Sequence, residues 1–272
     1  CTVFMNSKVK QAQKEGASAL ILGLLGGYPV GARTVTELYG RGEIAREEAE
    51  QLLAFCNNSG PGFFLGVCGT AVLRNGAVAS LRDISSLSLR IVTERIGLAE
   101  PTADSLFCAG AFRSTLLLSP PGGGKTTLLR DLIRTLSLGS EDRAALRVAV
   151  VDERGEIAVC AGGEAQMALG THTDVLTLCP KAQGIGMVLR AMNPQVIAVD
   201  EITAEEDIRA MCLAANCGVG LLTSIHAASV DELHQKPLWR ELLRARVFRR
   251  CIVIRSNGGA RSYEVGDLPC SD

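Results

Sequence analysis

A run of three glycines followed by lysine and threonine is the part of this chain best suited to chemistry. Residues 114–127 read STLLLSPPGGGKTT, so an apolar, β-prone segment enters a Gly-rich turn and Lys125-Thr126 opens an amphipathic helix. Strand, loop and helix in this order are the context in which a Walker A pattern binds phosphate. Ser119 stands where the pattern usually has its first glycine. The alternative interpretation is a Gly-Pro surface turn before a helix.

The residues of this loop suit a polyphosphate for separate chemical reasons. Glycines let backbone N–H groups converge on phosphate oxygens without Cβ clashes, and the helix N-terminus adds a partial positive charge. Lys125 would supply a mobile cation, and Thr126 a hydroxyl ligand for Mg²⁺. The predicted nucleotide-binding residues are Pro121, Gly122, Gly123, Gly124, Lys125, Thr126 and Thr127.

Two adjacent acids end the apolar segment 196–201, which reads VIAVDE and resembles a Walker B strand. At the carboxyl end of a parallel sheet, Asp200 would lie beside Thr126, and the two would hold Mg²⁺. Glu201 would then orient and polarise an attacking water. The alternative is a buried strand whose terminal acids are merely solvated. The motif pair predicts Mg²⁺-dependent hydrolysis of ATP.

A second acidic strand end, VVDER at 150–154, lies between these two motifs in the sequence. Its position predicts an additional strand inserted between the two motif strands, as in the RecA-like branch of P-loop ATPases. Glu153 or Asp152 would hold water or metal from the opposite side of the site; alternatively, both acids only pair with Arg154. Residues 152–155 also match the D-x-x-G of GTPases, but the sequence lacks the guanine-selecting N-K-x-D.

A histidine follows the next predicted strand, in Thr223-Ser224-Ile225-His226-Ala227. At a strand end, His226 could sense the γ-phosphate and report its hydrolysis. The alternative is a structural histidine. Arg190, which precedes the Walker B strand, could reach a phosphate or a neighbouring subunit. The predicted catalytic residues are Lys125, Glu153, Glu201 and His226.

Strands and helices must alternate to position these residues, and from about residue 111 they do. Continuous apolar strands alternating with amphipathic helices predict a parallel sheet covered on both faces. We therefore predict an α/β, RecA-like P-loop NTPase domain over residues 101–272. The expected strands are 114–118, 147–152, 196–200, 220–224 and 251–255, and the expected helices are 127–138, 180–192, 203–216 and 231–246.

The first hundred residues have a different character. Residues 63–100 predict a small β-rich segment with strands at 64–73, 77–81 and 87–92, an Asn-Gly turn at 75–76 and a linker at 97–102. Residues 1–62 predict a helical fragment with an amphipathic helix at 43–56.

Composition narrows the functional class. Hydrophobic residues make up 47% of the 272 residues and the formal net charge is -1, which indicates a globular protein and no nucleic-acid partner. Ten cysteines without a C-x-x-C pair favour neither a zinc site nor a redox dithiol, and fit a reducing cytosol. The apolar run 17–30 is too short to span a bilayer.

From about residue 67 to its end, the chain resembles the stage III sporulation protein AA family, ATPases related to the type II and type IV secretion ATPases. The matching segments are LRDISSL (81–87), SPPGGGKTTLLRD (119–131), VDER (151–154), TDVL with CPK (173–176, 179–181) and IAVDEI (197–202). The resemblance implies a ring-forming homo-oligomer in the mother-cell cytoplasm, peripheral at the inner face of a membrane. There it would power or assemble a channel complex, whose membrane proteins would be its partners. A histidine box in the secretion ATPases supports His226.

Residues 1–62 are similar instead to sporulation integral membrane proteins that carry a nucleoside-recognition (Gate) domain. The similarity rests mainly on GLLGGYPVGA (23–32) and FCNNSGP (55–61). The chain therefore looks like a fusion of two sporulation-gene fragments, joined between residues 60 and 69. Secretion-type ATPases close the nucleotide site with an N-terminal domain, most of which this fragment replaces. We expect ATP binding to survive and fast, oligomer-dependent turnover to be sensitive to the replacement.

Two further functions share the same motifs. One is a non-hydrolysing switch or scaffold, in which ATP binding only sets the oligomeric state. The other is a P-loop kinase, which needs an Arg-rich lid that the sequence does not offer.

Overall fold

The computed structural model describes residues 2–5, 36–42, 46, 63–74, 76–91, 94–161, 163–257 and 260–268. The chain divides into two compact units, Cys1–Thr93 and Glu94–Asp272. The candidate site residues all belong to the second unit. The domain boundaries at residues 62 and 100 remain a prediction.

The first unit contains a long antiparallel hairpin of β2 (Phe63–Arg74) and β3 (Ala77–Ile91), with β1 (Thr2–Met5) on the other edge of β3. The predicted break between strands 77–81 and 87–92 is wrong, because β3 runs through it. Asp83 has a φ of 48°, and the pairing shifts register between Cys68 and Thr70. These irregularities are β-bulges, which absorb extra residues without ending a strand.

Little of the predicted N-terminal helical fragment falls within the described residues. Residues 36–40 are helical, and so is Arg46, which lies in the predicted helix 43–56. The rest of that predicted helix lies outside the described residues.

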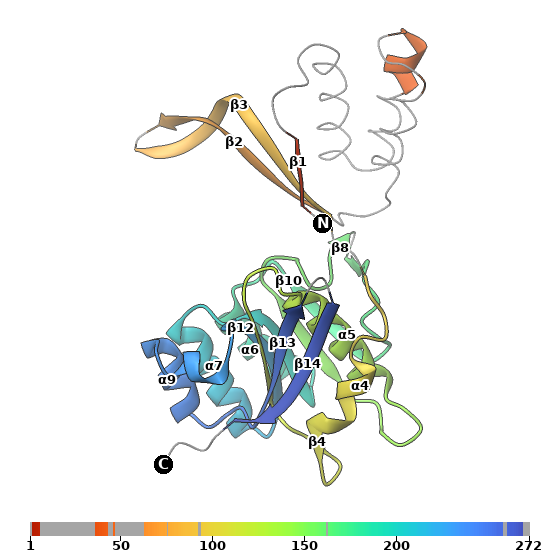
Figure 1. Cartoon of the computed structure of the whole chain (residues 1–272), viewed down its shortest axis with the longest axis vertical. Helices are drawn as coiled ribbons and strands as arrows, with labels where there is room; N and C mark the ends of the chain where they lie inside the picture. Colours follow the sequence, from red (N-terminus) through yellow and green to blue (C-terminus); the bar gives the residue numbers. More distant parts are fainter. Residues whose placement is uncertain are drawn as a thin grey trace. The chain divides into compact units, whose positions relative to one another are not determined.

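The second unit is built on a seven-stranded sheet in the order β10-β7-β11-β12-β6-β13-β14 (Figure 1). All neighbouring strands are parallel except β13 and β14. The α/β class with a mostly parallel central sheet is therefore confirmed. The strands are β6 (Thr115–Ser119), β7 (Val148–Asp152), β10 (Thr173–Thr177), β11 (Val196–Glu201), β12 (Gly220–His226), β13 (Arg250–Asn257) and β14 (Ala260–Asp267).

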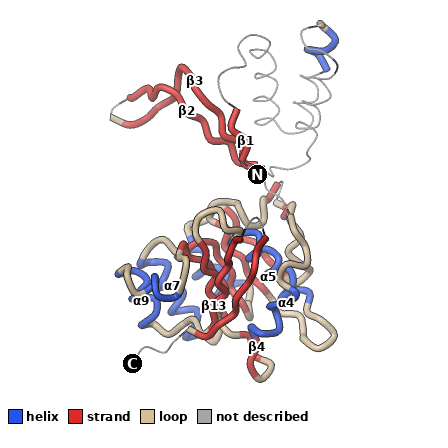
Figure 2. Tube along the Cα trace, in the orientation of Figure 1, coloured by secondary structure: helices blue, strands red, loops and turns tan. Residues whose placement is uncertain are grey.

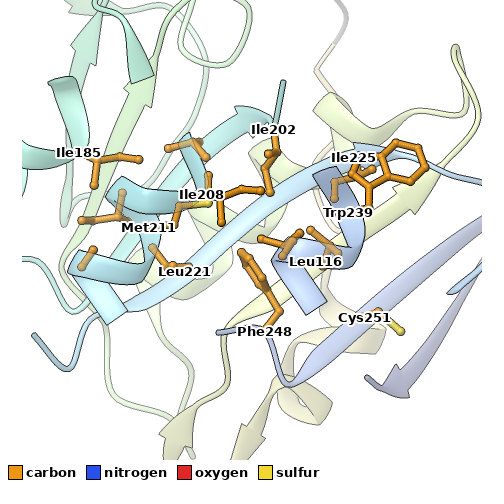
Figure 3. Close-up of a cluster of buried hydrophobic side chains, with 14 of the residues drawn as sticks. Leu116, Ile185, Ile202, Ile208, Met211, Leu221, Ile225, Trp239, Phe248 and Cys251 are labelled. Carbon is orange, nitrogen blue, oxygen red and sulfur yellow. The ribbon is translucent and has the colours of Figure 1, made fainter. Parts of the chain in front are cut away.

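Helices cover both faces of this sheet, as Figure 2 shows with blue helices around red strands. Buried side chains alternate along β6: Leu117 joins the core beneath α5, whereas Leu116 and Leu118 join the core beneath α6, α7 and α9. Figure 3 shows the core beneath α6, α7 and α9, with Trp239 among its members. The helices are α4 (Glu100–Ala103), α5 (Lys125–Leu138), α6 (Lys181–Ala191), α7 (Glu205–Asn216), α8 (Val230–Leu233) and α9 (Pro237–Arg244).

Several elements differ from the predictions. The helix expected at 231–246 is two helices, because Pro237 disfavours a helical conformation at Lys236, which is extended with φ -100° and ψ 133°. The linker expected at 97–102 contains the start of α4. The structure adds the edge strands β10 and β14, a 3₁₀ turn (Asp104–Leu106), and two short hairpins, β4 (Phe107–Cys108) with β5 (Ala111–Phe112) and β8 (Cys160–Ala161) with β9 (Glu164–Ala165).

Candidate functional site

The four central strands deliver the predicted motifs to one edge of the sheet. His226 at the end of β12 lies opposite Ser119 at the end of β6, and Glu201 at the end of β11 lies opposite Ser224. Asp152 ends β7, the neighbour of β11 on the side away from β6. The strand predicted at 147–152 is therefore present, but its predicted place between the two motif strands is wrong, because β12 and not β7 lies between β6 and β11. The carboxyl ends of parallel strands are where α/β proteins bind ligands.

The Gly-rich loop has a backbone that depends on its glycines. Gly122 and Gly124 have φ angles of 76° and 98°, which are unfavourable for residues with a Cβ. A Cβ added to Gly123 would overlap Oγ of Ser119 and lie 3.1 Å from the Pro120 carbonyl oxygen. Ser119, which replaces the usual first glycine, donates its hydroxyl to that same carbonyl over 2.8 Å. The loop is thus intact with serine at this position.

Lys125, the first residue of α5, lies against the loop that precedes it. Its Nζ donates to the carbonyl oxygens of Ser119 and Pro120, over 2.9 and 3.3 Å, and lies 2.5 Å from Nδ1 of His226. Burial lowers the pKa of Lys125, and the charge of Glu201 opposes this in part. Its described contacts are therefore two carbonyl oxygens and the imidazole of His226, and the acid Glu201 lies beyond that imidazole.

His226 joins the loop to the Walker B strand. Its Nε2 lies 2.9 Å from Oε2 of Glu201, while its Nδ1 faces Lys125. Because an ammonium only donates hydrogen bonds, Nδ1 accepts from Lys125 and the ring proton sits on Nε2, which donates to Glu201. We call Lys125, His226 and Glu201 the P-loop lysine network.

A second lysine occupies the far side of the same edge. Lys181, the first residue of α6, has Nζ 2.5 Å from Oε2 of Glu153 and 3.2 Å from Oδ1 of Asp200. Burial alone lowers the pKa of Lys181, but the hydrogen bond to Glu153 and the charge of Asp200 outweigh it and the pKa is raised. Burial raises the pKa of Asp200, opposed in part by Lys181. We call Glu153, Lys181 and Asp200 the buried lysine network.

The adjacent acids Asp152 and Glu153 have different hydrogen-bond partners. Asp152 is fully buried and accepts the backbone N–H groups of Ile157 and Ala158, over 3.0 and 2.8 Å. It therefore fixes the loop after β7. Glu153 faces Lys181 instead. The alternative in which both acids only pair with Arg154 is wrong.

Two residues at this edge were not among the predicted site residues. Lys181 lies in the first turn of a helix, where the helix dipole disfavours a cation, and that mismatch is a signal of a tertiary partner. Arg261 on β14 packs against the loop, since a Cβ on Gly124 would lie 2.8 Å from its Cζ and Nη1. The sequence carries no comparable signal for Arg261.

Arg190 lies elsewhere. It lines a hollow of about 680 Å³ with Phe112, Pro194 and Gly220. Gly220 begins β12, whereas His226 ends it, so this hollow is at the amino ends of the strands. Arg190 is therefore placed away from the phosphate loop of its own chain.

The residues at the carboxyl edge fit a magnesium nucleotide. The loop requires glycine at position 123, because a Cβ there would overlap Ser119, and the first N–H groups of α5 have no helical acceptor. The described residues contain no group of three or more His, Cys, Asp or Glu able to hold a metal by themselves. Thr126 and Asp200 would therefore need phosphate oxygens as additional ligands, as Mg²⁺ sites in nucleotide-binding proteins commonly do.

Comparison with known proteins identifies relatives in sequence. The family model described as "Sporulation stage III, protein AA" matches residues 45–264. Stage III sporulation protein AA of Bacillus subtilis is 39% identical over 207 residues, which are 76% of this chain and 67% of that protein. The sporulation integral membrane protein YlbJ of the same organism is 29% identical over 89 residues, 31% of this chain and 22% of that protein.

Solved structures share the fold. The ATPase DotB of Legionella pneumophila superposes with a TM-score of 0.52 at 18% identity, over 77% of this chain and 58% of that one. The pilus retraction motor PilT, solved with bound ADP, gives a TM-score of 0.51 at 16% identity, over 88% of this chain and 71% of that one. This chain thus spans about two thirds of the curated sporulation relative and less of DotB.

No helix within the described residues has the length and apolar character needed to cross a membrane. The mostly parallel sheet with the loop after β6 is the α/β P-loop fold of the ATPase DotB and the pilus retraction motor PilT. The family model covers most of the chain. The chain therefore belongs to the sporulation stage III protein AA family.

Proposed function

We propose that this chain binds ATP with Mg²⁺ and hydrolyses it, and that hydrolysis powers or assembles a sporulation membrane channel complex. The observation that carries the proposal is the P-loop lysine network, in which His226 joins Lys125 to Glu201 through contacts of 2.5 and 2.9 Å. A loop cation and a strand-end carboxylate at one edge are the two groups that phosphate hydrolysis requires.

The residues would divide the reaction between them. Lys125 and the amides of the Gly-rich loop would stabilise charge on the β- and γ-phosphates. Thr126 and Asp200 would hold Mg²⁺, which when bound neutralises phosphate charge and orients the reacting oxygens. Glu201 would orient the attacking water and accept its proton. His226 would pass a change at Lys125 to Glu201, which fits a sensor of the γ-phosphate.

Oligomerisation and location belong to the same proposal. We infer a homo-oligomeric ring at the inner face of a membrane on the mother-cell side, with channel proteins as partners. Family membership supports this inference. Sedimentation with and without Mg²⁺ and ATP tests it, since a nucleotide-dependent increase in mass is expected and a monomer under both conditions would contradict it.

Comparison of wild type with Glu201→Gln tests the activity. We expect wild type to release phosphate from Mg²⁺-ATP without any added acceptor. The variant should keep its ATP affinity by calorimetry and lose at least a hundredfold in turnover, because only the group acting on water has changed. Binding without phosphate release in wild type would favour the switch or scaffold, and release only with an added acceptor would favour a kinase. Absence of adenine nucleotide binding by folded protein would overturn the proposal.

A further inference from the structure

We propose that Lys181 is a positioning residue of this site, whose buried ammonium ties Glu153 to the metal-side carboxylate of Asp200 and so brings Glu153 into the reaction. The inference rests on the proposed function and adds to it a residue that acts on two others. Lys181 itself would touch neither nucleotide nor water.

Burial makes Lys181 an unusual lysine. Its side chain is 2% exposed, whereas those of Glu153 and Asp200 are 37% and 13% exposed. A lysine is almost never buried to this degree unless it is paired. Its place in the first turn of α6 is also unfavourable, because the N-terminal end of a helix carries positive partial charge. Two carboxylates offset both costs.

The backbone holds Lys181 in place against these carboxylates. Gly184, in the next turn of α6, lets the helix pack directly on β7: a Cβ there would lie 2.5 Å from Cγ1 of Val151. Val151 is one residue before Asp152 and two before Glu153. The start of α6 is therefore fixed relative to the end of β7, and close packing of this kind leaves little room for the ammonium to shift.

The two carboxylates come from neighbouring strands. β7 and β11 are parallel partners, with Val151 opposite Val199. Glu153, just after β7, and Asp200, near the end of β11, therefore lie at the same edge of the sheet. Like charges on adjacent strands repel. An ammonium between them converts repulsion into two attractions, one at 2.5 Å and one at 3.2 Å. Without Lys181, Glu153 has no described partner that would draw it towards Asp200.

This geometry makes Lys181 an outer-shell partner of the proposed metal ligand. Outer-shell partners of a ligating side chain orient it, here through an ion pair of 3.2 Å, and removing such partners typically lowers metal affinity or activity tenfold to a hundredfold. Because the same ammonium holds Glu153, a change at Asp200 is transmitted to Glu153. Lys181 and Glu153 should consequently act as one unit.

A double-mutant cycle on ATP turnover tests this coupling. We expect Lys181→Met and Glu153→Gln each to lower kcat tenfold or more with less than a threefold change in KM for ATP. The double variant should be no slower than the slower single variant, because each change removes the same arrangement. Lys181→Arg should recover part of the loss. Arg209→Met and Glu205→Gln, which break an exposed pair on α7, serve as matched controls and should leave kcat unchanged.

Magnesium-dependent binding provides a readout that does not need turnover. Calorimetry with a non-hydrolysable ATP analogue should show that Lys181→Met raises the Mg²⁺ concentration for half-maximal binding about tenfold or more. Affinity for the analogue without Mg²⁺, which depends on the Gly-rich loop, should stay within twofold. Multiplicative losses in the cycle, or an equal loss of metal-free affinity, would overturn the proposal.

Two variants of the cycle keep the test decisive if Lys181→Met folds poorly. Lys181→Arg retains the charge and changes the geometry, and Lys181→Met with Glu153→Gln removes one uncompensated carboxylate. Thermal unfolding identifies the folded variants. If wild type binds the analogue but releases no phosphate, the proposed hydrolysis fails while the magnesium measurement still decides the role of Lys181.

Discussion

Two lysines occupy equivalent places at the carboxyl edge and have opposite surroundings. Lys125 begins α5 and Lys181 begins α6, and both are buried. Lys125 contacts two carbonyl oxygens and a neutral imidazole, and its pKa is lowered by burial. Lys181 lies between two carboxylates, which raise its pKa against the effect of burial. The difference lies in charge compensation. Lys125 contacts no carboxylate directly, so its charge would be available to a ligand, whereas the charge of Lys181 is balanced by Glu153 and Asp200.

Replacing each lysine by methionine should separate the two roles most strongly. Lys125→Met should lower kcat/KM for ATP at least a hundredfold, about 3 kcal/mol of transition-state stabilisation, with a smaller change in the free energy of unfolding. Lys181→Met should lower the free energy of unfolding by about 3 kcal/mol, because it leaves two carboxylates without their cation. Urea unfolding and phosphate release measure the two effects. Equal stability losses for both variants would contradict the contrast.

Asp152 and Glu153 offer a second contrast, between a structural and a functional acid. Asp152→Ala should lower the free energy of unfolding by about 2–3 kcal/mol, because the buried N–H groups of Ile157 and Ala158 lose their acceptor. Glu153→Gln should change it much less, since the side chain of Glu153 is 37% exposed and Lys181 keeps Asp200 as a partner. Urea unfolding followed by circular dichroism measures both. A larger loss for Glu153→Gln would reverse the assignment.

Two glycines of the loop before Lys125 should differ in how strongly they affect nucleotide binding. Gly123→Ala should weaken nucleotide binding by about 2 kcal/mol, because its Cβ would overlap Ser119 and force the loop to move. A Cβ at Gly122 would meet no neighbouring atom within 4 Å. Gly122→Ala should therefore weaken nucleotide binding by only about 1 kcal/mol, because of the strained φ of 76°. Calorimetric titration with ATP compares them, and the reverse order would show that the loop adopts another conformation.

Breaking the link through His226 should have a smaller effect than replacing Lys125 or Gly123. His226→Ala breaks the connection between Lys125 and Glu201. We expect turnover to fall about tenfold, which corresponds to about 1.4 kcal/mol, with ATP affinity unchanged. His172→Ala is the control, since the imidazole of His172 bonds only Thr171 and Ser137 among the described contacts. A similar loss of turnover in both variants would argue against a specific role for His226.

The order of the nucleotide motifs could be predicted because it is local in sequence. Residues 114–127 contain strand, loop and helix without interruption, so β6 and α5 follow from apolar spacing and from the turn-forming glycines. The Walker B strand followed in the same way, from four apolar residues and two acids. Elements at the sheet edges, β10 and β14, escaped prediction because half-exposed strands lack a continuous apolar signal.

The sequence by itself determined the strand-loop-helix motif, the acidic strand end and the parallel strands that bring them to one edge, and from these it predicted the phosphate-binding residues. Only the tertiary structure decided their partners: that His226 lies between Lys125 and Glu201, that Lys181 balances Glu153 and Asp200, and that Arg261 packs on Gly124. The reason is physical. Backbone propensity and apolar periodicity act over a few neighbouring residues. The contact between Lys125 and His226 joins side chains 101 positions apart, and it forms only once the packing of helices on the sheet has fixed their distance.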